Sequence, residues 1–291
     1  MGLPRQDSQG EARSRGAARP VRRLVVNADD FGRSASINEA VIRAHREGIL
    51  TSASLMVNEP GCAEAVRLAQ ANPRLGVGLH LSLVCGRSAL GAEAIPALVN
   101  REGRFADSPL WCGWRYFFQS KLERQLRVEI RAQFDRFRAT GLALDHVNGH
   151  MHMHLHPTVF GILMEEAGTL GIERLRLTRE PLWVNLRLAG GRLGYRLSHA
   201  FVFGCLAAWA RPALRRRGIG HARAVFGLLQ NGRVDEDYLC QLLPRLPLGD
   251  SELYSHPSLT ECKDEFDALV SPRVREWVSR LGIELVRYQD F

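Results

Sequence analysis

The sequence predicts an α/β fold, a single TIM-barrel-like barrel with about seven or eight parallel strands. Short apolar runs alternate with amphipathic helical stretches along most of the chain, which is typical of parallel sheets. The length of 291 residues, without an internal repeat, favours one barrel over two smaller domains. A doubly wound open sheet stays an alternative, because it produces the same alternation.

The first half of the chain contains three apolar runs that read as strands, and most end at Gly or polar residues. We expect strands at 24–28, 52–57 and 75–79, helices at 37–48, 63–71 and 122–138, and an irregular segment at 84–115. Gly48 ends the first helix and Pro73 halts the second. His80 directly follows the third strand.

The second half continues the alternation around a histidine-rich block. We expect strands at 142–144, 175–177, 223–226, 252–255 and 283–287, with helices at 158–170 and 235–243 and a last helix that begins at Pro272. Residues 1–20 are rich in Gly, Arg, Ser and Ala and read as a disordered arm. The barrel therefore spans 21–291, with a basic and apolar insert near 180–222.

The composition excludes several classes of protein. The chain is 45% hydrophobic, yet no apolar run approaches the roughly 20 residues of a spanning helix. The amino terminus lacks the apolar core of a secretory signal, so we expect a cytoplasmic protein. The six cysteines are scattered without a C-x-x-C pair, which argues against a zinc ribbon or a disulfide framework.

The formal charge of +8 is concentrated in two segments. One is the arm, and the other is 174–223, where eleven Arg stand against Glu180 alone. Basic surface attracts nucleic acid or anionic lipid, although a compositional preference for Arg over Lys explains part of the charge. The chain has no zinc-finger or aromatic RNA-binding signature, so we expect no nucleic-acid partner.

Five of the ten histidines lie within 146–156. Neutral imidazole is the commonest metal ligand in proteins. The block follows an expected strand and precedes a helix that begins near Pro157, which is where α/β proteins build their sites. A polar loop of unpaired histidines is the alternative, and the position favours a metal site over it.

Other reactive side chains also follow expected strands. Asp29 and Asp30 follow the first strand, His80 the third, and His256 the strand at 252–255. A barrel gathers the carboxyl ends of its strands at one mouth. Asp30, His80 and His150 would then supply three metal ligands, while Asp29 takes a proton from water and His256 donates one. Alone, an Asp-Asp pair is as often a helix cap or a solvated turn.

Five motifs resemble those of the YdjC-like carbohydrate deacetylases, in order over about 22–291. They are VNADDFG at 26–32, GLHL at 78–81, H-x-x-x-H-x-H-x-H-x-x-P at 146–157, SHP at 255–257 and YQD at 288–290. LDHVNGH at 144–150, LPRLP at 243–247 and LVSPRV at 269–274 are closer to the hopanoid biosynthesis-associated HpnK branch. The oligosaccharide branch usually has Asp-Ser where this chain has Asn148-Gly149.

The resemblance implies one divalent ion, magnesium or zinc, held by Asp30, His80 and His150, with Asp29 as base and His256 as acid. It also implies a role for residues around these, either in binding substrate or in supporting the ligands. These residues are Asn148, His152, His154, Arg176 and Arg179, the last two in an Arg-x-x-Arg pattern before Pro181.

The implied reaction is hydrolysis of the N-acetyl group of an N-acetylglucosamine-type sugar. The HpnK likeness favours an acetylglucosaminyl hopanoid glycolipid as substrate. A soluble deacetylase of chitooligosaccharides or another N-acetyl sugar is the first rival, and a non-enzymatic metal or nucleic-acid binder the second.

An apolar run of twelve residues at 199–210 precedes Arg211 and Arg215 to Arg217. Apolar residues beside Arg and Trp suit a lipid interface, so 199–217 is a candidate for a peripheral contact with the inner face of the membrane. A core helix with a basic cap is the alternative. An oligomer is compatible with the sequence.

Overall fold

The computed structural model describes residues 21–188 and 190–291, so the predicted arm at 1–20 lies outside the described residues. The strands are β1 (Arg22–Phe31), β2 (Ser52–Leu55), β3 (Gly76–Leu81), β4 (Val147–Gly149), β5 (Ala224–Phe226), β6 (Gly249–Ser255) and β7 (Glu284–Leu285). The helices are α1 (Ala35–Glu47), α2 (Cys62–Gln70), α3 (Pro109–Phe118), α4 (Glu123–Ala139), α5 (Pro157–Glu165), α6 (Ala167–Leu170), α7 (Leu182–Leu188), α8 (Leu193–Arg216), α9 (Glu236–Leu242), α10 (Lys263–Val270) and α11 (Pro272–Arg280).

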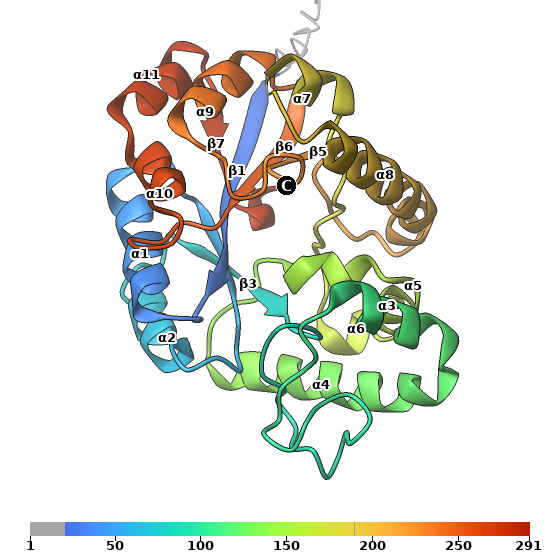
Figure 1. The fold of residues 1–291 in the computed structure, drawn as a ribbon. Helices are drawn as coiled ribbons and strands as arrows, with labels where there is room; N and C mark the ends of the chain where they lie inside the picture. Colours follow the sequence, from blue (N-terminus) through green and yellow to red (C-terminus); the bar gives the residue numbers. More distant parts are fainter. Residues whose placement is uncertain (1–20, 189) are drawn as a thin grey trace, which may run out of the picture.

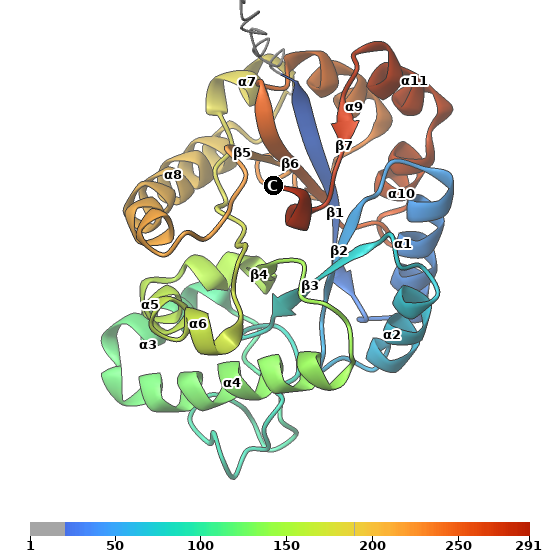
Figure 2. The same ribbon diagram turned by 180° about the vertical axis from the view of Figure 1, so that it is seen from behind.

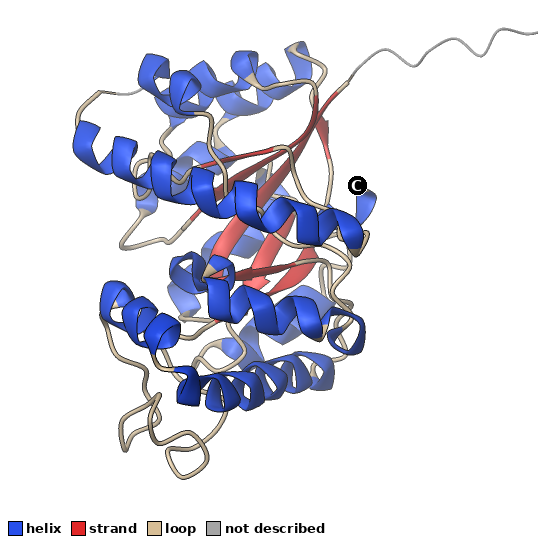
Figure 3. Ribbon diagram, turned by 90° about the vertical axis from the view of Figure 1, so that its right-hand side faces the viewer, coloured by secondary structure: helices blue, strands red, loops and turns tan. Residues whose placement is uncertain are grey.

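The strands form a parallel sheet in the order β4-β3-β2-β1-β6-β5, with β7 added beside the start of β1. The sheet curls into a half-barrel, and helices lie around its outer side (Figures 1 and 3). The α/β fold with a parallel sheet is therefore confirmed.

The closed barrel of seven or eight strands needs correction. Between β4 and β5 the described chain has no ladder, and the expected strand at 175–177 forms only isolated bridges, Val147 with Leu175 and Arg174 with Gly220. β4 and β5 are three residues long, and the segment between them reaches each through single backbone contacts. The Arg176 N–H donates to the Val147 carbonyl at 3.0 Å, and the Val225 N–H donates to the Arg179 carbonyl at 3.0 Å. Seen from behind, this open side lies between β4 and β5 (Figure 2).

The register of the sheet decides which side chains meet at its carboxyl edge. β1 is buried from Leu24 to Phe31, as a central parallel strand covered on both faces must be. It pairs with β6 up to Ala28 and Ser255, so Asp29 and His256 follow at the same level.

On the other flank of the sheet, β3 pairs with β4 through His80 and Asn148. A side chain at Gly78 would collide with the His146 ring at 2.5 Å, which explains the glycine in β3.

Most elements of the first half lie close to their expected positions. The Ser34 side chain accepts a hydrogen bond from the Ile37 N–H and caps α1, which ends at Gly48 as expected. Two expectations near the histidine block were wrong. The strand expected at 142–144 begins only at Val147, and the helix at 158–170 is split into α5 and α6.

Three helices, α3, α7 and α10, were not expected from the sequence, and α8 was expected only in the alternative interpretation of 199–217 as a core helix. The segment 84–115 was read as irregular, yet α3 begins within it at Pro109, with Ser108 as its N-cap. α10 lies between β6 and α11, where no helix was expected. The insert near 180–222 contains α7 and the 24-residue α8. Among the described residues, no helix is both long enough and apolar enough to span a bilayer.

Candidate metal centre

Two adjacent carboxylates at the end of β1 reach the same imidazole. In a regular strand, neighbouring side chains point to opposite faces of the sheet. Here the register between β1 and β2 shifts between Ala28 and Phe31, and Asp30 has a left-handed φ of 63°. The alternation is broken at that point. Asp29 Oδ1 consequently lies 4.0 Å from His80 Nδ1, and Asp30 Oδ1 lies 3.3 Å from His80 Nε2.

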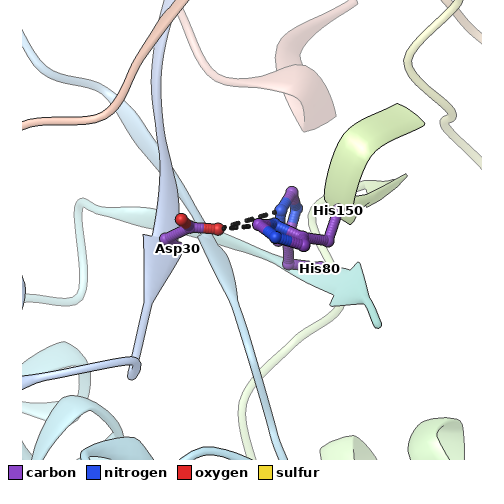
Figure 4. A group of neighbouring side chains, drawn as sticks. All are labelled: Asp30, His80 and His150. Carbon is purple, nitrogen blue, oxygen red and sulfur yellow. Dashed lines mark hydrogen bonds and ion pairs between the residues drawn. The ribbon is translucent and has the colours of Figure 1, made fainter. Parts of the chain in front are cut away.

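Asp30, His80 and His150 form a buried group of potential metal ligands (Figure 4). One donor atom from each lies within 4.8 Å of the others. Asp30 Oδ1 faces His150 Nδ1 at 3.0 Å as well as His80 Nε2, while its other oxygen accepts a hydrogen bond from Arg33 at 2.8 Å. The structure thus brings together the three residues predicted as ligands.

The hydrogen bonds of His80 test whether this group suits a cation. The Asn148 amide nitrogen donates to Asp29 and to Ser54, so its carbonyl oxygen accepts from His80 Nδ1 at 2.7 Å. A neutral His80 then carries its proton on Nδ1 and directs the Nε2 lone pair at the Asp30 carboxylate. Two acceptors facing each other at 3.3 Å repel, and a cation between them converts this repulsion into ligation. The donor set fits a divalent metal.

Arg176 joins Asp29 to a second buried carboxylate. Its guanidinium donates to both oxygens of Asp29, at 2.7 and 2.9 Å, and to Glu252 at 2.8 Å. It also lies 4.4 Å from the centre of the Tyr254 ring, and the Tyr288 hydroxyl donates to Glu252. Such a bidentate pair fixes the plane of the carboxylate. Arg176 therefore holds Asp29 in one orientation.

Asp29 stays ionised in this environment. Burial alone would raise the pKa of the carboxyl, but the charge of Arg176 outweighs it and holds the pKa well below its usual range. Oδ1 accepts from Asn27, Asn148 and Arg176, whereas among the described residues Oδ2 accepts from Arg176 alone. Oδ2 is the atom with room for a proton.

The other histidines of the block are separated by a tight turn. Met151 and His152 both have left-handed φ angles, 51° and 57°. His152 hydrogen-bonds to the Tyr254 hydroxyl at 3.0 Å, and His154 points into the core and bonds to the Arg176 carbonyl at 2.9 Å. Burial lowers the pKa of His154 to about 3. His152 thus lies at the site, and His154 beneath it.

Of two further residues predicted at the site, His256 lies there and Arg179 does not. His256 lies on the wall of the site, with its backbone N–H donating to Glu265 at 2.6 Å and a side chain that is 29% exposed. Arg179 is exposed and is absent from the lining of the cavity, so the structure does not bring it into the site.

A cavity opens above these residues, with about 510 Å³ of empty space that is partly open to solvent. Its polar lining comes from the carboxyl ends of β1, β3, β4 and β6, and its other wall comes from α8 and the loop after β5. The lining residues are Asp29, His80, Gly149, His150, Met151, His152, Tyr195, His199, Phe203, Leu228, Asn231, Tyr254 and His256.

Sequence reasoning missed Glu252 and Tyr254, and it quoted Tyr288 only as part of a motif. A charged residue inside a strand that is buried from Ser251 to Ser255 was an available signal. Glu252 and Tyr254 are two residues apart on β6 and therefore face the same side of the sheet. Tyr195 and His199 on α8 carried no comparable signal.

A family model and several relatives of known name match this chain. The model of the family described as YdjC-like protein matches residues 23–280. A carbohydrate deacetylase of Geobacillus stearothermophilus is 40% identical over 93% of this chain and 98% of its own length. A carbohydrate deacetylase of Brevibacillus brevis is 43% identical over 50% of this chain, and the match spans 55% of that protein.

Two further similarities are more distant. A chitooligosaccharide deacetylase of Proteus mirabilis is 36% identical over 55% of this chain and 62% of its own length. The crystal structure of a putative cellobiose-phosphate cleavage protein of Enterococcus faecalis superposes with a TM-score of 0.69 at 22% identity, covering 93% of this chain and 98% of that one. At that identity the likeness supports the fold alone.

Proposed function

This chain belongs to the YdjC-like family, and we propose that it is a metal-dependent hydrolase that removes the N-acetyl group from an N-acetylglucosamine-type sugar. The observation that carries the proposal is the ionised Asp29, buried beside the Asp30, His80 and His150 group at the base of one cavity. The relatives named carbohydrate and chitooligosaccharide deacetylase support the same reaction class.

Each residue of the site has a task in this proposal. Asp30, His80 and His150 hold one divalent cation, and their two imidazoles suit zinc better than magnesium, which prefers oxygen ligands. The cation would supply Lewis-acid activation of water and of the acetamide carbonyl. Asp29 Oδ2 accepts the proton of the attacking water, and Arg176 keeps that carboxylate oriented. His256 donates a proton to the leaving amine.

We place His152 and Asn148 in supporting roles. Asn148 orients the His80 ring and touches Asp29, so it links the proposed ligand to the proposed base. His152 lines the cavity, and its two ring nitrogens bond to the hydroxyls of Tyr254 and Thr178, so it fixes this wall of the cavity around the substrate. His154 supports the backbone of Arg176 from below.

For the substrate we favour an amphiphilic one, an N-acetylglucosaminyl hopanoid glycolipid acted on during hopanoid biosynthesis. The cavity shares Met151, His152, His199 and Phe203 with a larger groove of apolar lining, which suits a hydrophobic aglycone. A soluble chitooligosaccharide is the rival substrate. The Asn148-Gly149 pair, where the oligosaccharide branch usually has Asp-Ser, speaks against that rival.

The test is acetate release by the purified protein from an N-acetylglucosaminyl hopanoid and from chitobiose. The protein is first chelated, and zinc or magnesium is then added back. We expect turnover of the lipid, restored by metal, and a fall in kcat of about 10³-fold in Asp29→Asn, which keeps the shape of the side chain but not its charge.

Each other outcome changes a definite part of the proposal. Turnover of chitobiose alone moves the protein to soluble sugars and rejects the lipid. No acetate from either substrate, with metal bound, rejects both. Full activity in Asp29→Asn rejects the proposed base, and metal binding without any turnover favours a non-enzymatic binder.

A further inference from the structure

Large apolar side chains gather on the outside of α3. Five of its ten residues are between 50 and 88% exposed, namely Leu110, Trp111, Trp114, Phe117 and Phe118. Trp111 stacks on Trp114 with a ring separation of 5.4 Å, and Trp114 lies 5.5 Å from Phe118, so they form one continuous patch. Monomeric proteins rarely leave such a patch exposed without a partner.

α8 shows the same feature. Of its 24 residues only Arg196, Ala207, Ala210 and Leu214 are buried, whereas five large apolar side chains are 45 to 72% exposed. These five are Leu193, Leu197, Phe201, Val202 and Trp209. A surface helix usually turns its large apolar residues inward. α8 instead turns its alanines inward and presents several of its large residues to the outside.

The two helices are the banks of one groove. α3 and α8 lie on the same side of the molecule in both views (Figures 1 and 2). The groove has a volume of about 1140 Å³. Leu110 and Trp114 line one bank, Val202 and Leu206 the other, and Met153 lies between them. At its inner end it shares residues with the cavity over Asp29 and His80.

The α8 bank also carries uncompensated positive charge. Arg211, Arg215 and Arg216 lie in its last turns, and the sequence has no Asp or Glu between Glu180 and Asp235. Among the described residues, none of these three guanidinium groups lies within ion-pair distance of a carboxylate. Burial, followed by the charges of Arg179 and Arg215, lowers the pKa of Arg211, so like charges face one another here.

We propose that α3 and α8 together dock on the surface of an anionic phospholipid bilayer. The aromatic side chains lie at the hydrocarbon boundary, and the Arg residues at the end of α8 meet the lipid phosphates. Three of the five Trp residues lie on α3 and α8, and Trp is enriched at membrane interfaces. A second copy of the chain would bring the same positive cluster to the same face, so charge favours lipid over self-association.

The docking surface extends the expected contact at 199–217 to a second helix that the sequence did not indicate. Its use rests on the proposed function, because docking would set the groove mouth against the layer in which a glycolipid resides. The binding itself requires no catalysis.

The test is sedimentation of the full chain with vesicles of phosphatidylcholine that do or do not contain phosphatidylglycerol. We expect binding to the anionic vesicles, weakened about tenfold in the double variant Phe118→Ser, Phe201→Ser and weakened by a similar factor in Arg215→Gln, Arg216→Gln. Leu248→Ser, which removes an apolar side chain that is 46% exposed just before β6, is the matched control and should bind like the wild type.

Three outcomes would overturn the docking surface. They are wild type that stays in the supernatant, variants that sediment like wild type, and a dimer in sedimentation velocity that the Phe118 and Phe201 changes dissociate. Acetate release from the detergent-solubilised N-acetylglucosaminyl hopanoid and from chitobiose is measured in parallel, without vesicles. Vesicle binding without any acetate release upholds the docking surface and rejects the proposed enzyme, whereas acetate release without vesicle binding does the reverse.

Discussion

Two adjoining regions of this molecule are built on opposite principles. The polar site, formed by Asp29, Asp30, His80, His150, Arg176 and Glu252, is buried, and its side chains bond to one another. The apolar banks on α3 and α8 are exposed, and their side chains contact few partners. In the first region, removing one group leaves its neighbours without partners, so effects should be large. In the second, effects should appear only when a partner is present.

The largest effect on folding should come from removing the Arg176 guanidinium, which is the positive charge at the centre of the polar site. Arg176→Met removes the charge that faces two buried carboxylates, and leaving buried charges unpaired costs about 3–5 kcal/mol. The free energy of unfolding in urea measures it. Arg131→Met is the control, because Arg131 pairs with Glu166 at the surface, where such bridges contribute little. Equal stability of the two variants would contradict the distinction between buried and exposed pairs.

The insert that carries α8 has a buried polar anchor of its own, and it gives the second prediction. Glu180 accepts hydrogen bonds from Asn185 on α7 and from the Leu229 N–H, while Asn185 accepts from Arg196 on α8. Burial raises the pKa of Glu180 from 4.5 to about 7 despite these hydrogen bonds.

The sign of the pH effect follows from proton uptake. Between pH 4.5 and 7 the folded chain holds a proton on Glu180 that the unfolded chain has lost, so this group makes stability fall as pH rises. The penalty is absent below pH 4.5 and reaches about 3 kcal/mol above pH 7. Glu180→Gln should therefore gain stability relative to wild type between pH 5 and pH 8, measured by urea unfolding. Parallel curves for the two proteins would refute the raised pKa.

The third and smallest effect concerns Asn148, which bonds to a proposed metal ligand but is not itself a proposed ligand. Asn148→Ala removes the acceptor that fixes the His80 ring, and loss of such a partner typically lowers metal affinity about 10- to 100-fold. Competition with a chromophoric zinc chelator measures the affinity of the metal-free protein. Ser54→Ala is the matched control, because Ser54 bonds to Asn148 and His146 but not to a proposed ligand. A zinc affinity unchanged in Asn148→Ala would show that Asn148 does not orient the site.

The polar site and the apolar banks also differ in how much of each could be predicted from the sequence. The polar site was predictable because parallel strands end at one edge, so Asp30, His80 and His150 had to meet. The break in β1 at Asp30 was not predictable, since its left-handed φ depends on the register with β2. The pairing of Arg176 with Asp29 was not predictable either, because the sequence does not give the distance between residue 176 and the end of β1.

The apolar banks were only half visible in the sequence. The run at 199–210 stood out by its composition, but α3 begins inside a segment without periodicity, and its apolar side chains gave no sign of being exposed. The exposure of a side chain depends on how the whole molecule packs, so it cannot be read from the neighbouring sequence. The prediction of a closed barrel was wrong for a related reason, because the lengths of β4 and β5 depend on how the molecule packs.

The most direct test of the account is a titration of the metal-free protein with zinc, in which bound metal and acetate release are measured on the same samples. We predict that acetate release rises with bound zinc and levels off at one ion per chain, and that His80→Ala neither binds zinc tightly nor releases acetate. Undiminished acetate release from the metal-free protein, or zinc binding that is unchanged in His80→Ala, would contradict the central claim.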